Sequence, residues 1–282
     1  MPRGLDHIVH AVCDLEAAGA FYERLGFQVG ARNRHPWGTE NRLVQLPGFF
    51  LEILAVVEPD KIAGATFGAF NQKFLSEVGE GLSALVVEGH DPKGERAALD
   101  AAGFGGIPLL EFSRQGKRPD GSETEVGFKI AFARYPAAAH ALFFTCMQTA
   151  PESFWSAELQ RHPNGARQIA AAVLVAENPT DHHIFLEALT GVRDIRATSL
   201  GLTIPTPRGA IQVMDPRSFK QAFGAEAPRD AGLRLAALVF TVADLKATRA
   251  LLEQNGVPAR EQAGRLVTGP EAAFGATVAF LA

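Results

Sequence analysis

The chain has 282 residues, of which 47% are hydrophobic and 21% are charged, and its formal net charge is −4. This length fits two domains, and the composition is that of a globular protein with a buried core. The acidic balance, without a basic block or an aromatic-basic stripe, argues against nucleic acid as a partner. The longest apolar runs, such as 233–242, are too short to span a bilayer, so we expect no membrane partner either.

The first residues and the cysteines indicate the compartment. Met1 to Gly4 lead directly into a predicted strand, without the apolar core of a signal peptide. Cys13 and Cys146 lie far apart on segments that resemble buried strands, which favours two buried thiols over a disulfide. We therefore expect a cytoplasmic protein.

A pattern of helix cap and terminal glycine recurs four times along the chain. Each copy has a short apolar run, an Asp or Asn that can cap a helix, an apolar-periodic stretch, and a Gly followed by a hydrophobic residue. The copies run from Asp14 to Gly26, Asp91 to Gly103, Asn178 to Gly191 and Asp244 to Gly256. The cap-to-glycine distances are 12, 12, 13 and 12 residues, which indicates an internal repeat of one structural unit.

The first copy predicts a β-α-β-β-β unit. Alternation predicts a strand over 5–13, and helical periodicity predicts a helix over 15–25. Short strands are expected near 27–31, 41–46 and 49–57. On the first strand, a period of two gives one face to Leu5, His7, Val9, Ala11 and Cys13. On the last strand, the same period gives one face to Phe50, Glu52, Leu54 and Val56.

The later copies repeat this order. The second begins at 82, carries a hairpin with its turn at 118–121, and ends on the apolar run 141–146. The third runs over about 168–214 and the fourth over about 233–281. Between them, residues 149–167 include the adjacent Phe154 and Trp155, so we expect a packed linker. The predicted fold is therefore α+β, with four βαβββ modules paired into an N-terminal domain, 1–148, and a C-terminal domain, 168–282.

Several motifs resemble the vicinal oxygen chelate superfamily, which includes glyoxalases, extradiol dioxygenases and fosfomycin-resistance proteins. They are Leu5-Asp6-His7-Ile8-Val9 with Asp14-Leu15, Phe21-Tyr22-Glu23-Arg24-Leu25-Gly26-Phe27, and Phe50-Leu51-Glu52-Ile53-Leu54. Within the superfamily, the chain is most similar to large glyoxalase-like domain proteins. That similarity rests on His35-Pro36-Trp37-Gly38-Thr39 with Asn41-Arg42-Leu43, and on Phe112-Ser113-Arg114 with Lys117-Arg118-Pro119-Asp120-Gly121. The motifs cover modules 4–57 and 82–147, and the repeat pattern alone extends the likeness beyond 168.

The resemblance implies two glyoxalase-like domains with cup-shaped mixed β-sheets, the second of them degenerate. Members of the superfamily usually hold a divalent metal with a His on the first strand and a Glu on the last strand of each unit. In unit one, His7 and Glu52 stand in the matching places. The matching positions elsewhere are Ala84 in unit two, whose closing strand 141–146 has no carboxylate, Ala171 and Gln212 in unit three, and Ala237 and Ala279 in unit four. The site is thus expected to be half present, in the N-terminal domain only.

The chemistry of His7 and Glu52 leaves several arrangements open. A neutral imidazole and a carboxylate suit one divalent metal such as Zn, Ni, Mn or Fe, and do not select among them. Such a site needs a third donor, for which Gln148, His140 and His162 are candidates. Alternatively, His7 and Glu52 hydrogen-bond each other, or Arg114 pairs with Glu52, because a lone buried carboxylate is costly.

Further residues are candidates for lining the cup. His35, Trp37 and Asn41 lie on the loop and strand entry at its rim, where they either contact a substrate or form a packed turn. Arg114 and Arg118 can bind a carboxylate or phosphate, or be solvated hairpin charges. Cys146 can line the cup or act as a nucleophile, although a Cys after two Phe is usually an inert small hydrophobe.

Two classes of function follow from these residues. In the first, the protein is a glyoxalase-like enzyme, such as a metal-dependent lyase, isomerase or dioxygenase-like enzyme. Its catalytic residues are Glu52 and His7, and its substrate is a small oxygen-rich molecule. In the second, it is a metal-free protein that binds or sequesters a small molecule, which the 20 Phe residues favour. The C-terminal domain is expected to bury one face of the first domain, act as a lid, or mediate a homodimer.

Overall fold

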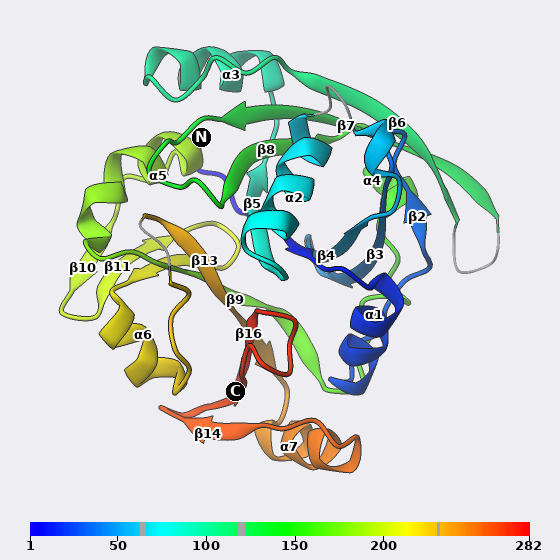
Figure 1. The fold of residues 1–282 in the computed structure, drawn as a ribbon, viewed down its shortest axis with the longest axis vertical. Helices are drawn as coiled ribbons and strands as arrows, with labels where there is room; N and C mark the ends of the chain where they lie inside the picture. The colour runs from blue at the N-terminus through cyan, green and yellow to red at the C-terminus, as the bar shows by residue number, and fades with distance from the viewer. Residues whose placement is uncertain (63–65, 118–121, 230–231) are drawn as a thin grey trace.

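The computed structural model describes residues 1–62, 66–117, 122–229 and 232–282 (Figure 1). Eight of its strands belong to the N-terminal half: β1 (Leu5–Ala11), β2 (Asn33–Arg34), β3 (Thr39–Leu46), β4 (Phe49–Val56), β5 (Gly81–Glu88), β6 (Leu110–Lys117), β7 (Glu123–Ala133) and β8 (Leu142–Gln148). They form one mixed sheet in the order β2-β3-β4-β1-β5-β8-β7-β6. The two halves of this sheet meet at the antiparallel pair β1–β5, and each half closes with a parallel pair, β1–β4 or β5–β8.

The C-terminal half repeats this architecture. Its strands are β9 (Ala166–Val175), β10 (Arg196–Thr198), β11 (Gly201–Pro205), β12 (Ala210–Met214), β13 (Arg234–Val242), β14 (Arg260–Gln262), β15 (Arg265–Thr268) and β16 (Thr277–Leu281). They form a second sheet in the order β10-β11-β12-β9-β13-β16-β15-β14. The order is the same as in the first sheet, so the predicted fold of four βαβββ modules is confirmed.

One helix follows the first strand of each module: α1 (Leu15–Arg24), α3 (Pro92–Ala101), α5 (His183–Thr190) and α7 (Leu245–Gln254). Asp14, Asp91 and Asp244 accept backbone hydrogen bonds at three of these helix starts, as predicted. Asn178 does not cap, because the short 3₁₀ helix η2 (Pro179–His182) precedes α5. The four glycines that follow the helices all have positive φ, between 65° and 81°.

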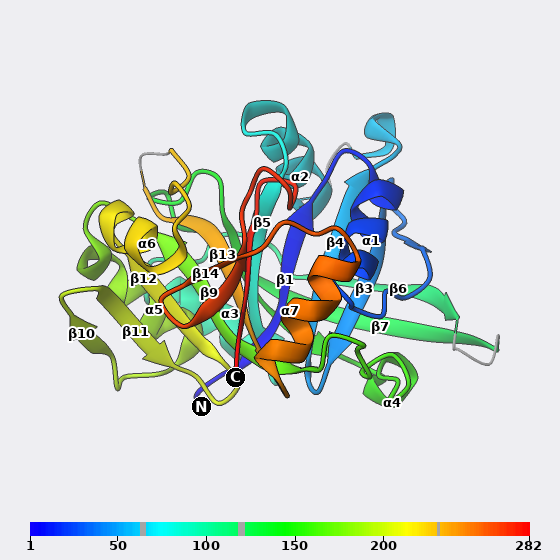
Figure 2. The same cartoon turned by 90° about the horizontal axis from the view of Figure 1, so that it is seen from below.

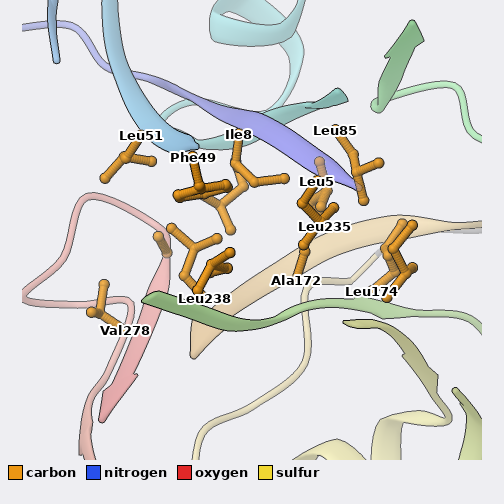
Figure 3. Packing of buried hydrophobic residues seen from close by; sticks show 14 of the residues in the cluster. Leu5, Ile8, Phe49, Leu51, Leu85, Ala172, Leu174, Leu235, Leu238 and Val278 are labelled. Carbon is orange, nitrogen blue, oxygen red and sulfur yellow. The ribbon is translucent and has the colours of Figure 1, made fainter. Parts of the chain in front are cut away.

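The largest core lies between the two sheets, which pack face to face (Figure 2). Figure 3 shows side chains of the first sheet, among them Ile8, Phe49 and Leu85, meeting Leu235 and Leu238 of the second. Polar contacts join the two halves as well. The Arg208 guanidinium lies 2.7 Å from the Glu88 carboxylate, and the Arg3 backbone N–H donates to the Thr190 carbonyl at 2.7 Å. The C-terminal half therefore covers one face of the N-terminal sheet.

The other face of each sheet forms a separate cluster. In the first sheet, this face lies beneath α2 (Thr66–Glu77), which contacts β1 and β4. The segment after β8 adds α4 (Pro151–Phe154) to the same cluster, and Trp155 packs against it. In the second sheet, α6 (Pro216–Phe223) occupies the equivalent position. The remaining short helix, η1 (Pro59–Lys61), precedes α2.

Two details of β1 differ from the sequence-based expectation. Leu5 packs in the core between the sheets rather than on the face of His7, because the pairing with β5 shifts register between Leu5 and His7. Cys13 lies beyond the end of β1 and is exposed, whereas Cys146 is buried; both are free thiols. His10 faces α1, where its Nδ1 bonds to the Tyr22 hydroxyl at 2.8 Å, and its Nε2 bonds to the Phe274 carbonyl at 2.8 Å.

Two further expectations concern spanning segments and the hairpin turn. Of the helices in the described part of the chain, none has the length and apolar character needed to cross a bilayer. The turn predicted at 118–121, with Arg118, lies outside the described residues.

Candidate active site

His7 lies on β1, on the side of the first sheet away from the C-terminal half. Its ring stacks on Phe50 at 4.3 Å between centroids, and its Nδ1 lies 2.6 Å from Oδ1 of the buried Asp6. This short contact fixes the proton on Nδ1, which donates to the carboxylate. The lone pair of Nε2 therefore remains available on the other side of the ring.

Glu52 lies on β4, the neighbouring strand, and only 5% of its surface is exposed. The Asn41 side-chain amide donates to its Oε1 at 2.6 Å, and His7 Nε2 lies 3.9 Å from its Oε2. The latter distance is too long for a hydrogen bond, so His7 and Glu52 do not pair directly. Burial raises the pKa of the Glu52 carboxyl, and nearby His7, Asn41 and Arg114 offset part of that rise.

His35 reaches the same carboxylate from the loop between β2 and β3. Its Nε2 lies 3.7 Å from Glu52 Oε1, and its Nδ1 bonds to the Thr39 hydroxyl at 2.8 Å. The Asn41 amide nitrogen, 3.5 Å from Nε2, favours the tautomer with the proton on Nδ1. Burial, aided by the nearby Arg114 and His7, lowers the pKa of His35 to about 3. His35 is therefore neutral near pH 7, which is the state that binds metal ions.

All seven site residues predicted from sequence line one cavity. They are His7, His35, Trp37, Asn41, Glu52, Arg114 and Cys146. Aromatic and aliphatic side chains from β3, β4, α2, β6, β7, β8 and α4 form the rest of the wall. A second cavity adjoins the first, and Leu43, Arg114 and Phe154 line both. A cavity with an apolar wall and a few inward polar groups is typical of a small-molecule site.

Arg114 does not pair with Glu52, in contrast to one of the alternatives considered above. It is 8% exposed, and it has no ion-pair partner within 4 Å among the described residues. Its guanidinium lies 6.0 Å from the Phe128 ring centre, and burial lowers the pKa of Arg114. Arg114 therefore presents to the cavity a positive charge that the Glu52 carboxylate, which is not in ion-pair contact, offsets only in part.

Cys146 lies on β8 near the back of His7. Donor atoms of Asp6, His7 and Cys146 lie within 4.8 Å of one another, in the one such group of three among the described residues. Burial raises the pKa of the Cys146 thiol well above its ordinary value, and neighbouring Asp6 and Glu52 add to the rise. The thiol is therefore protonated at neutral pH, which disfavours both a nucleophilic role and metal binding by this group.

None of the three residues expected to supply a third donor lines the cavity. His162 accepts from the Gln28 backbone N–H and donates to the Gln45 carbonyl, which ties the linker to the first module. His140 bonds to Glu77, and the Gln148 amide lies 3.4 Å from Asp6. His35, which sequence analysis did not consider as a donor, is the residue that stands close to Glu52.

The strand register gives the equivalent positions in the other modules. Glu52 lies two residues after the partner of His7 on β4. In the other modules, the residue two positions after the strand partner of Ala84 is Phe144. The residues at the same offset for Ala171 and Ala237 are Gln212 and Ala279. Three of these C-terminal positions, Ala171, Ala237 and Ala279, pack in one cluster with Phe219 and Phe223 of α6. The side chains of α6 thus pack against the face where the second cup would hold its ligands.

Asp6 is the site residue that sequence analysis missed. Alternation along β1 gives it the face opposite to His7, but the register shift beside it lets the two side chains meet. The adjacent Asp-His pair in the sequence is the only signal that could have drawn attention to it.

Comparisons with known proteins agree with this fold. A family profile described as "Glyoxalase-like domain" matches residues 5–190. No curated protein sequence matches the chain at a significant level. A hypothetical protein from Staphylococcus aureus superposes with a TM-score of 0.69 and 12% identity, over 99% of this chain and 98% of the other.

Two similar structures carry enzyme names. A mutant of 4-hydroxymandelate synthase from Streptomyces coelicolor matches with a TM-score of 0.60 and 12% identity, over 99% of this chain and 92% of that one. A xylose isomerase-like TIM barrel/4-hydroxyphenylpyruvate dioxygenase fusion protein matches with a TM-score of 0.58 and 16% identity, over 99% of this chain and 49% of that one. At such identities the likeness concerns the fold alone.

Proposed function

The chain belongs to the glyoxalase-like domain family, within the vicinal oxygen chelate superfamily, and from this we propose that its N-terminal cup binds and acts on a small oxygen-rich molecule with the help of one divalent cation. The protein residues that would hold the cation are His7 and Glu52, with His35 as the third donor. The proposal concerns the first cup only, because the second has neither a His nor a carboxylate at the equivalent positions.

The contact between Asp6 and His7 carries this proposal. A metal-binding His usually donates its second ring N–H to a carboxylate, which fixes the tautomer and aims the free nitrogen at the metal. Here the 2.6 Å contact to Asp6 leaves Nε2 free toward Glu52. The Nε2 atoms of two imidazoles thus lie within 4 Å of the two oxygens of one buried carboxylate, at 3.9 and 3.7 Å. A cation among these donors would offset the cost of burying the Glu52 charge.

The donor set defines the chemistry of the site. A bound Zn, Ni, Mn or Fe ion would polarise an oxygen of the bound molecule and stabilise negative charge that develops there. The protein residues orient that molecule: Asn41 holds the Glu52 carboxylate, and the aromatic wall excludes water. The raised pKa of Glu52 also suits it to carry a proton at its free oxygen when the cation is absent.

A metal-free binding protein is the second candidate. The observation that favours it is the pair Ala84 and Phe144, which removes both donors of unit two and replaces one of them with an aromatic ring. In this case, His7, Glu52 and Asn41 would hydrogen-bond the oxygens of a ligand, and the function would be sequestration.

Metal content distinguishes the two candidates. The full chain, purified without a histidine tag and incubated with each of the four metals, is dialysed and analysed by plasma mass spectrometry. We expect near-stoichiometric retention of one metal by the wild type and by Glu125→Gln, an exposed carboxylate on β7. Glu52→Gln should retain none. Equal retention by Glu52→Gln, or none in any protein, would reject the proposed cation site.

A further inference from the structure

Within the part of the chain that the structure describes, two buried hydrogen-bond donors in the wall of the N-terminal cavity have no partner. They are Nε of Arg114 and Nε1 of Trp37, and both residues line the same cavity. Buried polar groups in folded proteins are nearly always hydrogen-bonded, so each exception calls for an explanation. The proposed cation site does not use either donor, because both carry N–H groups that a cation repels.

The arrangement around Arg114 leaves its carboxylate-binding edge free. Its Nη1 donates one long hydrogen bond, 3.4 Å, to the Gln115 carbonyl, while Nε has no acceptor. In proteins the guanidinium fork binds a carboxylate through two parallel N–H groups. With 92% of its surface buried, Arg114 has lost much of its hydration, and the long bond to Gln115 replaces only a small part of it.

Trp37 adds a second donor on the same wall. Its ring stacks on His35 at 5.0 Å and packs edge-on against Phe112 at 4.6 Å, while Phe112 stacks on Phe128 at 5.2 Å. Gly68 of α2 permits this position, because a Cβ there would lie 3.0 Å from Trp37 Cδ1. Phe128 in turn lies under the Arg114 guanidinium. One continuous aromatic surface therefore connects the two unpaired donors.

We propose that Arg114 binds the carboxylate of an aromatic acid, whose ring packs on the Phe112–Phe128 surface, and that Trp37 donates to a polar atom of the same molecule. This deepens the proposed function, on which it rests, by naming the class of molecule that the cup takes. A carboxylate would supply acceptors to the guanidinium and neutralise the Arg114 charge. The apolar wall favours an aromatic body over a hydrated anion such as free phosphate, which could not use that surface.

The test compares acids with their uncharged amides. Calorimetry on the full chain at pH 7 measures binding of benzoate, phenylacetate and 3-phenylpropionate, each beside its primary amide and beside inorganic phosphate. We expect at least one acid to bind about 10- to 100-fold more tightly than its amide, the range for a hydrogen bond to a charged group. Phosphate should bind more weakly than that acid. If no acid exceeds its amide in the wild type, or if phosphate binds best, the inference is wrong.

Variants assign the preference to these residues. Arg114→Gln should abolish the preference for the acid, and Trp37→Phe, which keeps an aromatic ring but removes the donor, should weaken acid binding severalfold. Arg134→Gln, an exposed arginine after β7, is the matched control and should bind as the wild type does. An acid preference that persists in Arg114→Gln would overturn the assignment.

Thermal unfolding separates ligand binding from a structural role. If Arg114 serves a ligand, the ligand-free Arg114→Leu protein should unfold at the same temperature as the wild type or higher, because a buried guanidinium whose Nε has no acceptor is removed. A clear fall in melting temperature would indicate a structural role instead. Metal retention is measured separately. If Arg114→Gln retains the metal and the wild type shows no preference for the acid, this inference is rejected and the cation site is not. A wild-type protein that prefers the acid but retains no metal rejects only the cation site.

Discussion

The Asp6–His7 contact gives the most specific prediction about the proposed cation site. Asp6→Asn keeps the size of the side chain but removes its charge, so that His7 Nδ1 loses a charged acceptor at 2.6 Å. Asp6 is 5% exposed, and its other described side-chain contact is the 3.4 Å hydrogen bond from Gln148. Water therefore has little access to replace the lost interaction, and the free nitrogen of His7 becomes less basic and less well oriented.

Two independent estimates give the size of the effect. Loss of a carboxylate behind a metal-binding His typically weakens metal affinity about 10- to 100-fold, which corresponds to roughly 1.4–2.8 kcal/mol. A hydrogen bond to a charged group contributes about 1.5–3 kcal/mol, which covers nearly the same range. We therefore expect Asp6→Asn to bind zinc about 10- to 100-fold more weakly than the wild type.

Competition with a chromophoric zinc chelator measures this affinity in the full chain. Asp60→Asn, an exposed Asp on η1, is the control and should match the wild type. Circular dichroism and thermal unfolding establish that Asp6→Asn is folded. If folded Asp6→Asn binds zinc as tightly as the wild type while Glu52→Gln does not bind it, the role given to Asp6 is refuted.

Two further predictions concern stability. Phe219 of α6 is fully buried against the second sheet, so Phe219→Ala should lower the free energy of unfolding by about 3–5 kcal/mol and Phe219→Leu by less. A loss below about 1 kcal/mol in urea unfolding of Phe219→Ala would contradict the packing described here. Burial lowers the pKa of His10 from 6.5 to about 4, so its contribution to stability is present above pH 6.5 and is lost as the pH falls toward 4. The loss in the free energy of unfolding is about 3 kcal/mol. His10→Gln should reduce the difference in this free energy between pH 7 and pH 4.5, as measured by urea unfolding. The same difference in His10→Gln as in the wild type would exclude His10 as its source.

The sequence predicts the repeat because the cap and the glycine depend on local backbone chemistry. Asp14, Asp91 and Asp244 cap helices for reasons that act within one turn, and the glycines adopt positive φ where the helices end. The common face of His7 and Glu52 also follows from the period of two along their strands. Seven predicted residues therefore line one cavity.

What the sequence does not predict depends on long-range geometry. Asp6 meets His7 because β1 shifts register against β5, a strand more than seventy residues away in the chain. His35 reaches Glu52 through a loop whose path depends on the packing of Trp37 against Phe112 and Gly68. The missing partner of Arg114 is likewise a property of the assembled cavity, since an Arg in a hairpin is usually solvated.

The most direct test of the central claim is to locate the cation. Crystals of the full chain grown with zinc would be measured on both sides of the zinc absorption edge. The account predicts one strong anomalous peak in the N-terminal cup among His7 Nε2, Glu52 and His35, and none in the C-terminal cup. The absence of a peak in the first cup, or a peak between Asp6 and Cys146 behind His7, would contradict it.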